Sequence, residues 1–372
     1  MHKQFLLAAL EQAWLGRGMC APNPSVGAVA VRHGKIIAQS WHRGAGTPHA
    51  EVLLLNSLPE HCSDVIMYVT LEPCNHWGRT PPCVDAIINR GIQQVVYAYA
   101  DPNPLVSANN TTALLKEKGI SALHFPLPEI DRFYESYRRW MLTGKPWVTA
   151  KIAQTFDGKI GLSNKRAIIS NPLCAEFTHK NRLHSDVILT TARTINQDDP
   201  LLTVRLPDQT QAKPVAIIDS QLTLNPQAKV LTQSAHCHVY HHSLIAPEHP
   251  FDNCSYHAMP LEGLPREDEP GDFRKSDNSS ALDLSAIIHH LGSLGYHDVW
   301  VEAGSELFNA LHTAGLVNRT YVYLAPQLLG EEAIAAWKNT TIFNRPYSIT
   351  WQAMGDNMIA QFDWQEETCL PD

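Results

Sequence analysis

The sequence has little that would direct the chain to a membrane or to nucleic acid. No apolar stretch within its 372 residues is long enough for a membrane-spanning helix. Acidic residues outnumber basic ones by 37 to 29, and the net charge of −8 disfavours a polyanion as the main substrate. The first apolar run is interrupted by Glu11 and Gln12 and does not resemble a secretory signal. We therefore expect a cytoplasmic protein that binds neither membrane nor nucleic acid, although a small phosphorylated molecule is compatible with this charge.

Cysteine is also scarce, and a glycine-rich dinucleotide motif is missing. Eight cysteines in a chain of this length do not make the dense framework of a small disulfide-bonded domain. The segment G-x-G-x-x-G, which marks the common dinucleotide-binding fold, does not occur. Six cysteines are interpreted as unpaired thiols, namely Cys20, Cys62, Cys174, Cys237, Cys254 and Cys369.

The chain is predicted to fold as two α/β domains, because single cores rarely grow beyond roughly 250–300 residues. Gly144-Lys145-Pro146 marks the boundary between domains of residues 1–144 and 145–372. In the first domain, strands are expected at 26–31, 36–41, 65–70, 94–98 and 120–125, and helices at 5–17, 50–55, 83–88, 111–118 and 129–144.

The second domain shows the same alternation. Strands are expected at 147–153, 187–190, 215–219 and 298–302, and helices at 171–182, 286–292 and 307–314. Residues 192–195 are expected to continue the strand before them. Residues 243–281 are polar and rich in proline, so no structure is assigned to them.

A histidine, a glutamate and two cysteines form the most specific motif. His49 and Glu51 follow Pro48, and Cys74 and Cys83 come later in the chain. One imidazole and two thiolates suit Zn²⁺, and three protein ligands leave the fourth tetrahedral position for water. Glu51 is interpreted as the proton carrier rather than as a ligand. The pattern matches the signature of the zinc deaminases.

The spacing of the two cysteines departs from that signature. The usual C-x-x-C is widened to eight intervening residues between Cys74 and Cys83. Buried cysteines often act only as small apolar side chains, but the ordered combination of ligands, glutamate and prolines disfavours chance. His49 and Cys83 are each expected at the start of a helix. The positive helix end at Cys83 favours the thiolate form of that cysteine.

Two further segments carry weaker signals. Gly304 lies between a predicted strand and helix, where backbone N–H groups can approach a phosphate, although such a joint is more often a plain turn. The segment from His236 to His242 contains four histidines. Alternation through Cys237 and Val239 favours a strand edge there over a second metal site.

With these residues assembled, the chain resembles the bifunctional deaminase/reductase family of riboflavin biosynthesis. The resemblance covers nearly all of residues 1–365 and is stronger in the first half. Its motifs there are Pro22-Asn23-Pro24-Ser25-Val26-Gly27, 48–52, 71–74, 78–83 and 101–104; in the second half they are Lys151 with Asp157-Gly158, 194–205, 217–220 and 301–304. The segment 78–83, which fills the widened cysteine spacing, is itself typical of this family.

The resemblance implies an N-terminal cytidine-deaminase-like three-layer domain followed by a dihydrofolate-reductase-like α/β domain. It implies zinc-dependent hydrolytic deamination of 2,5-diamino-6-(5-phosphoribosylamino)pyrimidin-4(3H)-one in residues 1–144. NADPH-dependent reduction of the ribosyl group to ribityl is then expected in residues 145–372. Zn²⁺ is expected on His49, Cys74 and Cys83, with Glu51 as the catalytic residue.

The resemblance also implies contacts with substrate and cofactor. Asn23 and Asp101 are expected to position the pyrimidine ring, and His42, His76 and Arg79 to meet the ribose phosphate. NADPH contacts are expected from Ala153, Thr194, Asp198, Ser220, Gly304, Ser305, Glu306, Leu307, Phe308, Asn309 and Ala310. Substrate contacts in the second domain are expected from Arg182, Leu202, Arg205 and Glu302. From the residues alone, the alternative for the five contacts in the first domain is turn geometry or surface solvation. The alternative for Arg182 and Arg205 is an ordinary surface ion pair.

One segment, residues 165–170, departs from the family pattern. Family members usually carry Ser-x-Trp-Ile-Ser/Thr there, whereas this chain has Lys-Arg-Ala-Ile-Ile-Ser. A deaminase with an impaired reductase-like domain is therefore an alternative. A nucleic-acid base-editing deaminase is disfavoured by the acidic balance, and a zinc-stabilised binding protein would release no ammonia. A homo-oligomer is expected.

Overall fold

The computed structural model describes residues 1–59, 62–78, 81–108, 110–162, 168–261 and 281–365. The chain divides into two compact units, Met1–Lys145 and Pro146–Asp372. Among the described residues, no helix combines the length and apolarity needed to cross a membrane.

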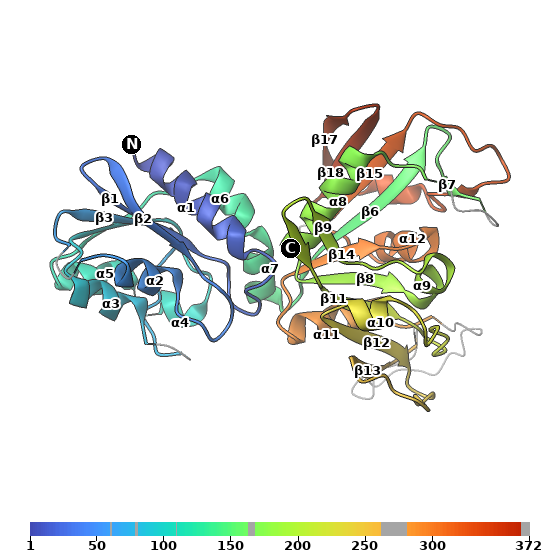
Figure 1. Ribbon diagram of the computed structural model, residues 1–372, viewed down its shortest axis with the longest axis horizontal. Coiled ribbons are helices and arrows are strands. Elements are labelled where there is room, and N and C mark those ends of the chain that lie inside the picture. The colour runs from blue at the N-terminus through green and yellow to red at the C-terminus, as the bar shows by residue number, and fades with distance from the viewer. Residues whose placement is uncertain (60–61, 79–80, 109, 163–167, 262–280, 366–372) are drawn as a thin grey trace, which may run out of the picture. The chain divides into compact units, whose positions relative to one another are not determined.

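The first unit contains a five-stranded sheet in the order β2-β1-β3-β4-β5, covered by helices on both faces (Figure 1). Strand β1 pairs antiparallel with β2 and β3, whereas β3, β4 and β5 run parallel. The strands are β1 Gly27–Arg32, β2 Lys35–Trp41, β3 Val65–Leu71, β4 Gln94–Tyr99 and β5 Ser121–His124. The helices are α1 His2–Gly16, α2 Ala50–Asn56, α3 Cys83–Arg90, α4 Pro104–Ser107, α5 Thr111–Glu117, α6 Pro128–Phe133 and α7 Glu135–Thr143.

Helix α1 packs closely on β1 because residue 27 is glycine. A Cβ atom at Gly27 would lie 2.0 Å from the Ala9 carbonyl oxygen and 2.4 Å from the Ala13 nitrogen, so a larger residue would push the helix away. The Ser25 hydroxyl donates to the Ala13 carbonyl at 2.6 Å. These contacts hold the loop before β1 against α1, and Asn23 in that loop lines the cavity described below.

The second unit contains a nine-stranded sheet in the order β13-β12-β11-β8-β14-β6-β15-β18-β17. The strands from β13 to β15 run parallel, and β18 and β17 are antiparallel to their neighbours. Side chains of α11 and α12 belong to one buried apolar cluster, together with residues of the central strands. Side chains of α9 and α10 belong to a second cluster, which contains alternate residues of the same strands. Helices therefore cover both faces, as the near-continuous apolar strands require.

The elements of this unit are as follows. Its strands are β6 Trp147–Thr155, β7 Lys159–Gly161, β8 Val187–Thr191, β9 Val204–Leu206, β10 Gln209–Gln211, β11 Pro214–Ile218, β12 His236–His242, β13 Cys254–Met259, β14 Asp298–Glu302, β15 Arg319–Ala325, β16 Ile334–Ala335, β17 Tyr347–Met354 and β18 Asn357–Trp364. Its helices are α8 Pro172–His184, α9 Ala192–Asp198, α10 Val230–Gln233, α11 Leu284–Ser293 and α12 Ser305–Thr313, with a 3₁₀ helix at Thr341–Asn344.

Two expected elements differ in the structure. Residues 192–195 do not continue β8 but form the start of α9, because the Thr191 hydroxyl caps the helix by accepting the Thr194 N–H at 3.1 Å. The single helix expected at 129–144 is two helices, α6 and α7, which meet at Tyr134 with φ −94° and ψ 5°.

The segment 243–281, to which no structure was assigned, contains strand β13. This strand is short, polar and only partly buried for most of its length, so its side chains give little of the apolar alternation that predicts a strand. Strand β13 forms the edge of the sheet, and β12, which was interpreted as a strand edge, lies between β11 and β13. Residues 262–280 lie outside the described part of the chain.

Candidate active sites

The three predicted metal ligands come from the starts of two helices and from the loop after β3. His49 is the N-cap residue of α2, and Cys83 is the first residue of α3, directly after Pro82. Helices α2 and α3 pack against each other, which brings His49 and Cys83 together. The Val84 N–H donates to the Cys74 carbonyl at 3.2 Å and ties the loop to α3.

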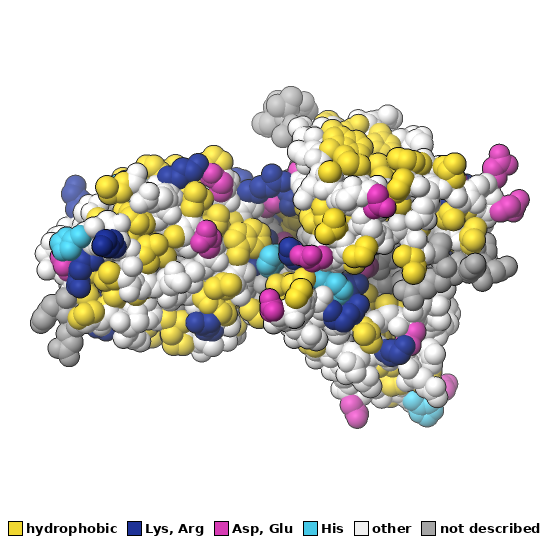
Figure 2. Space-filling model, turned by 45° about the horizontal axis from the view of Figure 1, so that its top comes forward, with side chains coloured by type: hydrophobic (Ala, Val, Ile, Leu, Met, Phe, Trp, Pro, Cys, Tyr) yellow, Lys and Arg dark blue, Asp and Glu magenta, His cyan; other side chains and the backbone are white. Residues whose placement is uncertain are grey.

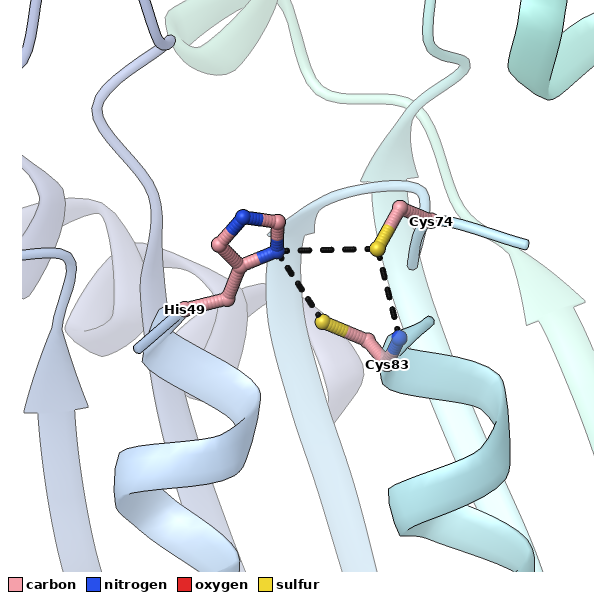
Figure 3. A group of neighbouring side chains, drawn as sticks. All are labelled: His49, Cys74 and Cys83. Atoms are coloured by element: carbon pink, nitrogen blue, oxygen red, sulfur yellow. Dashed lines mark hydrogen bonds between the residues drawn. The ribbon is translucent and has the colours of Figure 1, made fainter. Parts of the chain in front are cut away.

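Figure 3 shows the three side chains pointing toward one another. His49 Nδ1 lies 3.2 Å from Cys83 Sγ and 3.5 Å from Cys74 Sγ, and the Cys83 N–H donates to Cys74 Sγ at 3.2 Å. The donor atoms all lie within 4.8 Å of one another. Among the described residues, no other group of histidine, cysteine and acidic side chains converges in this way, including the histidines of β12.

This donor set fits a zinc ion. Imidazole nitrogen and thiolate sulfur are the ligands that Zn²⁺ prefers. Hydrogen bonds from the Cys83 thiol and from His49 lower the pKa of Cys74 to about 4, which favours the thiolate form that a metal binds. Within the described chain the group has three ligands, the number typical of a catalytic zinc rather than of a structural one.

Glu51 lies buried beside these ligands. It is the second residue of α2, and only 4% of its surface is exposed. Burial raises the pKa of its carboxyl group to about 7, although the charge of His49 opposes this shift. A carboxyl group with a pKa near neutrality both accepts and donates protons readily, as a general acid and base must.

A cavity of about 280 Å³ opens onto His49, Glu51 and Cys74. Four of the predicted substrate contacts line it, namely Asn23, His42, His76 and Asp101. His76 Nδ1 is buried and has no hydrogen-bond partner among the described residues, so it is a polar atom that a ligand would satisfy. Arg79, the fifth predicted contact, lies outside the described residues.

His42 and Asn23 order each other at the wall of this cavity. His42 Nδ1 lies 3.2 Å from the Pro48 carbonyl oxygen, and His42 Nε2 lies 3.1 Å from Asn23 Nδ2. Burial lowers the pKa of His42, so the imidazole is held neutral. With Nδ1–H donating to Pro48, Nε2 accepts from the Asn23 amide.

A second buried carboxyl group, that of Asp101, faces the same cavity. Its Oδ1 accepts the Asn103 N–H at 2.9 Å and the Tyr137 hydroxyl at 3.2 Å, and burial raises its pKa to about 6. Glu72 and Tyr137 also line the cavity and were not predicted to do so. Glu72 stands in the motif of residues 71–74, which was an available signal. Tyr137 reaches the cavity from α7, and only the tertiary structure reveals it.

In the second unit, the predicted NADPH contacts lie toward the carboxyl ends of adjacent parallel strands. Ser220 follows β11, Thr194 and Asp198 lie in α9 after β8, Gly304 follows β14, and Ala153 lies near the end of β6. These four strands are neighbours in the sheet, in the order β11, β8, β14 and β6. Arg193 Nη1 of α9 lies 3.0 Å from Glu306 Oε2 of α12, so the starts of these two helices are side by side. Ligands of open α/β sheets commonly bind at this edge.

The segment from Gly304 to Ala310 is only partly available to a cofactor. Its buried residues are Ser305, Leu307, Phe308 and Asn309, and its exposed residues are Gly304, Glu306 and Ala310. Leu307 and Phe308 belong to the buried apolar cluster on this face of the sheet. Contacts with a cofactor would therefore come from the exposed residues and from backbone N–H groups at the helix start.

Arg182 and Glu302, two predicted substrate contacts, form a buried ion pair. Arg182 Nε lies 2.5 Å from Glu302 Oε1 and Nη2 lies 2.9 Å from Oε2, with 10% and 15% of the two side chains exposed. Arg182 Nη1 donates to the Thr203 carbonyl, and Trp300 Nε1 donates to Glu302 Oε1, both at 2.8 Å. Burial raises the pKa of Glu302, but Arg182 and Lys151 outweigh it and lower the pKa to about 2.

Lys151 stands beside this pair, although no role was predicted for it. Burial lowers the pKa of Lys151, and its Nζ lies 5.1 Å from the ring centre of Tyr323. Its place in a segment that resembles the deaminase/reductase family was the one sequence signal.

Leu202 lies in the segment that connects α9 to β9, and Arg205 lies in β9. Leu202 is buried with a φ of +51°, a left-handed conformation that is strained for this residue and that often occurs at functional sites. Arg205 Nη1 donates to Thr203 Oγ1 at 2.9 Å, and the Thr203 carbonyl accepts from Arg182. Thr203 thus joins the two arginines. Residues 165–167, half of the departing segment 165–170, lie outside the described residues.

Comparisons with known families match both units. Residues 1–99 match the cytidine and deoxycytidylate deaminase zinc-binding region, and residues 146–342 match the RibD C-terminal domain. The predicted fold class, a cytidine-deaminase-like domain followed by the α/β reductase domain of this family, is confirmed.

The similarity to individual proteins extends along most of the chain. Riboflavin biosynthesis protein RibD of Escherichia coli (strain K12) is 34% identical over 348 residues, which cover 90% of each chain. RibD of Aquifex aeolicus (strain VF5) is 33% identical over 339 residues, which cover 89% of this chain and 88% of that protein. The structure of Acinetobacter baumannii RibD, form 1, superposes with a TM-score of 0.82 at 26% identity and covers 98% of this chain and 99% of its own.

A further solved structure, the diaminohydroxyphosphoribosylaminopyrimidine deaminase/5-amino-6-(5-phosphoribosylamino)uracil reductase of Thermotoga maritima, has a TM-score of 0.80 and 26% identity, with 98% of this chain and 99% of that chain covered. The chain therefore belongs to the RibD family of riboflavin biosynthesis proteins, bifunctional enzymes that join a zinc-dependent deaminase to an NADPH-dependent reductase.

Proposed function

We propose that residues 1–144 deaminate 2,5-diamino-6-(5-phosphoribosylamino)pyrimidin-4(3H)-one and that residues 145–372 reduce the ribosyl group of the product to ribityl. The description of the Thermotoga maritima protein names this pair of activities. The observation that carries the proposal is the convergence of His49, Cys74 and Cys83 beside the buried Glu51 carboxyl group, at the wall of an open cavity.

Glu51 is the proton carrier of the first reaction in this proposal. Hydrolytic deamination replaces an amino group with oxygen from water, so protons must pass from water to a ring nitrogen and to the departing ammonia. Zn²⁺ held by the three ligands would lower the pKa of water toward about 7. A Glu51 carboxyl group with a pKa of about 7 is suited to accept a proton and to return it.

The walls of the cavity orient the pyrimidine. The neutral His42 imidazole and the Asn23 amide hold each other in place, and Asp101 presents a carboxyl group fixed by Asn103 and Tyr137. These donors and acceptors suit the amino and carbonyl groups at the edge of the ring. His76 and Arg79 are assigned to the ribose phosphate. His42, which was also predicted to meet the phosphate, is assigned to the ring instead, because Pro48 and Asn23 engage both of its ring nitrogens.

The second unit holds its substrate with Arg182, Leu202, Arg205 and Glu302. Because Glu302 neutralises Arg182, the more exposed Arg205 is the guanidinium most available to the phosphate, which its planar fork can bind through two oxygens. NADPH supplies the hydride when it is bound. Its contacts are assigned to Ala153, Thr194, Asp198, Ser220 and the segment from Gly304 to Ala310.

Small phosphorylated pyrimidines, rather than nucleic acid, are the proposed substrates. On the described residues of the face shown in Figure 2, basic and acidic side chains are scattered among neutral ones and form no continuous basic surface. A cytoplasmic location, which would give access to NADPH, and a homo-oligomeric assembly belong to this proposal as predictions.

The purified full-length, zinc-loaded protein provides the test. With the phosphoribosylated diaminopyrimidine we expect ammonia release, and with the deaminated product we expect oxidation of NADPH. The variant Glu129→Gln, altered at an exposed residue of α6 that pairs with Lys3, is the control and should behave as wild type. Absence of ammonia release would overturn the deaminase assignment. Ammonia release without NADPH oxidation would favour the deaminase with an impaired reductase-like domain.

A further inference from the structure

We propose that Cys237 and Cys254, at the edge of the reductase sheet, form a redox-active pair that a peroxide oxidises to a reversible disulfide. Cys237 lies in β12 and Cys254 is the first residue of β13. They are far from the zinc ligands in sequence and belong to the other unit.

The register of the two strands places the cysteines directly opposite each other. Cys237 pairs with Cys254 in the parallel ladder, and the Cys237 N–H donates to the Asn253 carbonyl at 2.9 Å. Neighbouring strands are about 4.8 Å apart, and a disulfide spans Cα atoms about 4.4–6.8 Å apart. The bond therefore requires no change in strand pairing.

Both side chains also point to the same face of the sheet. Cys237 is fully buried in the cluster that contains Val230 and Leu231 of α10, and Cys254 packs against that cluster while remaining partly exposed. A hydrogen bond between the two thiols lowers the pKa of Cys237, and Ser234 Oγ lies 3.1 Å from Cys237 Sγ. One sulfur of the pair is thus favoured as the nucleophilic thiolate.

The oxidation balances with hydrogen peroxide as the oxidant. The two S–H bonds and the O–O bond break, one S–S bond forms, each sulfur loses one electron, and the protons leave in two molecules of water. A dithiol reverses the reaction by thiol–disulfide exchange. In a reducing compartment such disulfides are transient and serve redox sensing rather than structure.

The disulfide would change the stability of one strand in particular. Strand β13 is the edge of the sheet and pairs only with β12 among the described strands. The carboxyl end of β12 is linked to the proposed cofactor site, because the His242 N–H donates to the Ser220 carbonyl at 3.1 Å. Oxidation would fasten the edge strand to the strand that supports Ser220.

The test uses the full-length, zinc-loaded protein treated with hydrogen peroxide. Remaining thiols are then alkylated, and the protein is digested without reductant for mass spectrometry. We expect a peptide pair linked through Cys237 and Cys254 that dithiothreitol separates. We also expect the Tm of the reductase unit to rise by about 5–10 °C, as for a disulfide that closes a loop of this size.

Two types of variant sharpen this test. Cys254→Ser and Cys254→Ala should both lose the linked peptides and the rise in Tm, whereas Cys62→Ser, at a buried cysteine of the other unit, should retain both. The proposal is overturned if Cys254 is oxidised only to sulfinic or sulfonic acid. It is also overturned if the linked peptides appear only in protein that has lost its native circular dichroism.

Discussion

Each candidate site buries one glutamate, and the two environments shift the pKa in opposite directions. Burial raises the pKa of Glu51 to about 7, while the single opposing charge nearby is that of His49. Burial also raises the pKa of Glu302, but Arg182 and Lys151 outweigh it and lower the pKa to about 2. A full guanidinium in a bidentate pair compensates for lost solvation, whereas a histidine shared with two thiols does not.

The difference matches the tasks proposed for the two residues. A carboxyl group that carries protons needs a pKa near the working pH, and Glu51 has one. A carboxylate that positions a neighbouring arginine and the substrate must stay ionised, and Glu302 does. A glutamate side chain is therefore suited to proton transfer in one unit and to holding a fixed negative charge in the other, because different charges lie beside it.

The replacement Glu51→Gln should have the largest effect of the variants that test this difference. Glutamine keeps the size of the side chain but cannot carry a proton, so we expect deamination to fall by about 10³-fold while zinc content and NADPH oxidation stay at wild-type values. Ammonia release and zinc content are measured on the same preparation. Deamination at the wild-type rate would show that another group moves the proton.

Removing the partner of Glu302 should have the next largest effect. Arg182→Met leaves a buried carboxylate without its guanidinium, and we expect the free energy of unfolding of the second unit to fall by about 3–5 kcal/mol, measured by urea denaturation. The double variant Arg182→Met/Glu302→Leu should recover most of the loss.

Lys180→Met provides the control for this measurement. It breaks an exposed pair of α8, in which Lys180 Nζ lies 2.7 Å from Glu176 Oε1, and should cost less than about 1 kcal/mol. A loss at Lys180 as large as that at Arg182 would contradict the argument that burial decides the cost.

Acid should destabilise the second unit before Glu302 is protonated. Burial lowers the pKa of His238, His257 and His312 to about 4, from 6.5 in the unfolded chain. Between these values the unfolded chain binds more protons, so the stability present above pH 6.5 is lost as the pH falls toward 4. Hydrogen exchange in β12 and α12 at about pH 7 and about pH 5 measures this loss. His312→Gln should weaken the pH dependence of the protection against exchange in α12. Protection that is equal at both pH values would contradict the expected loss of stability.

The smallest expected effect concerns Asp101, whose pKa of about 6 lies between those of the two glutamates. Tyr137→Phe removes the hydroxyl that donates to Asp101 Oδ1. One such bond contributes about 0.5–1.5 kcal/mol, so we expect KM for the pyrimidine to rise by roughly 3–10-fold with little change in kcat. A fall in kcat alone would assign Tyr137 to the chemical step.

The two units also differ in how much of each site could be predicted from local sequence. His49, Glu51, Cys74 and Cys83 lie close together in the chain, and metal chemistry restricts the residue types that can serve, so their pattern is specific. The residues of the second site are spread from Ala153 to Ala310. Only the parallel sheet brings the strand ends together, and without the family resemblance Arg182 would have been interpreted as a surface residue.

The residue pattern by itself indicated the candidate metal ligands, the candidate proton carrier, the presence of two α/β units and most of their strands, because ligand chemistry and apolar periodicity are local properties of a chain. The tertiary structure alone decided that Tyr137 reaches Asp101, that Arg182 and Glu302 pair in the interior, and that Cys237 faces Cys254. It also decided the opposite pKa shifts of the two glutamates. Burial and charge pairing depend on which distant segments pack together, and nothing in the neighbouring residues specifies that.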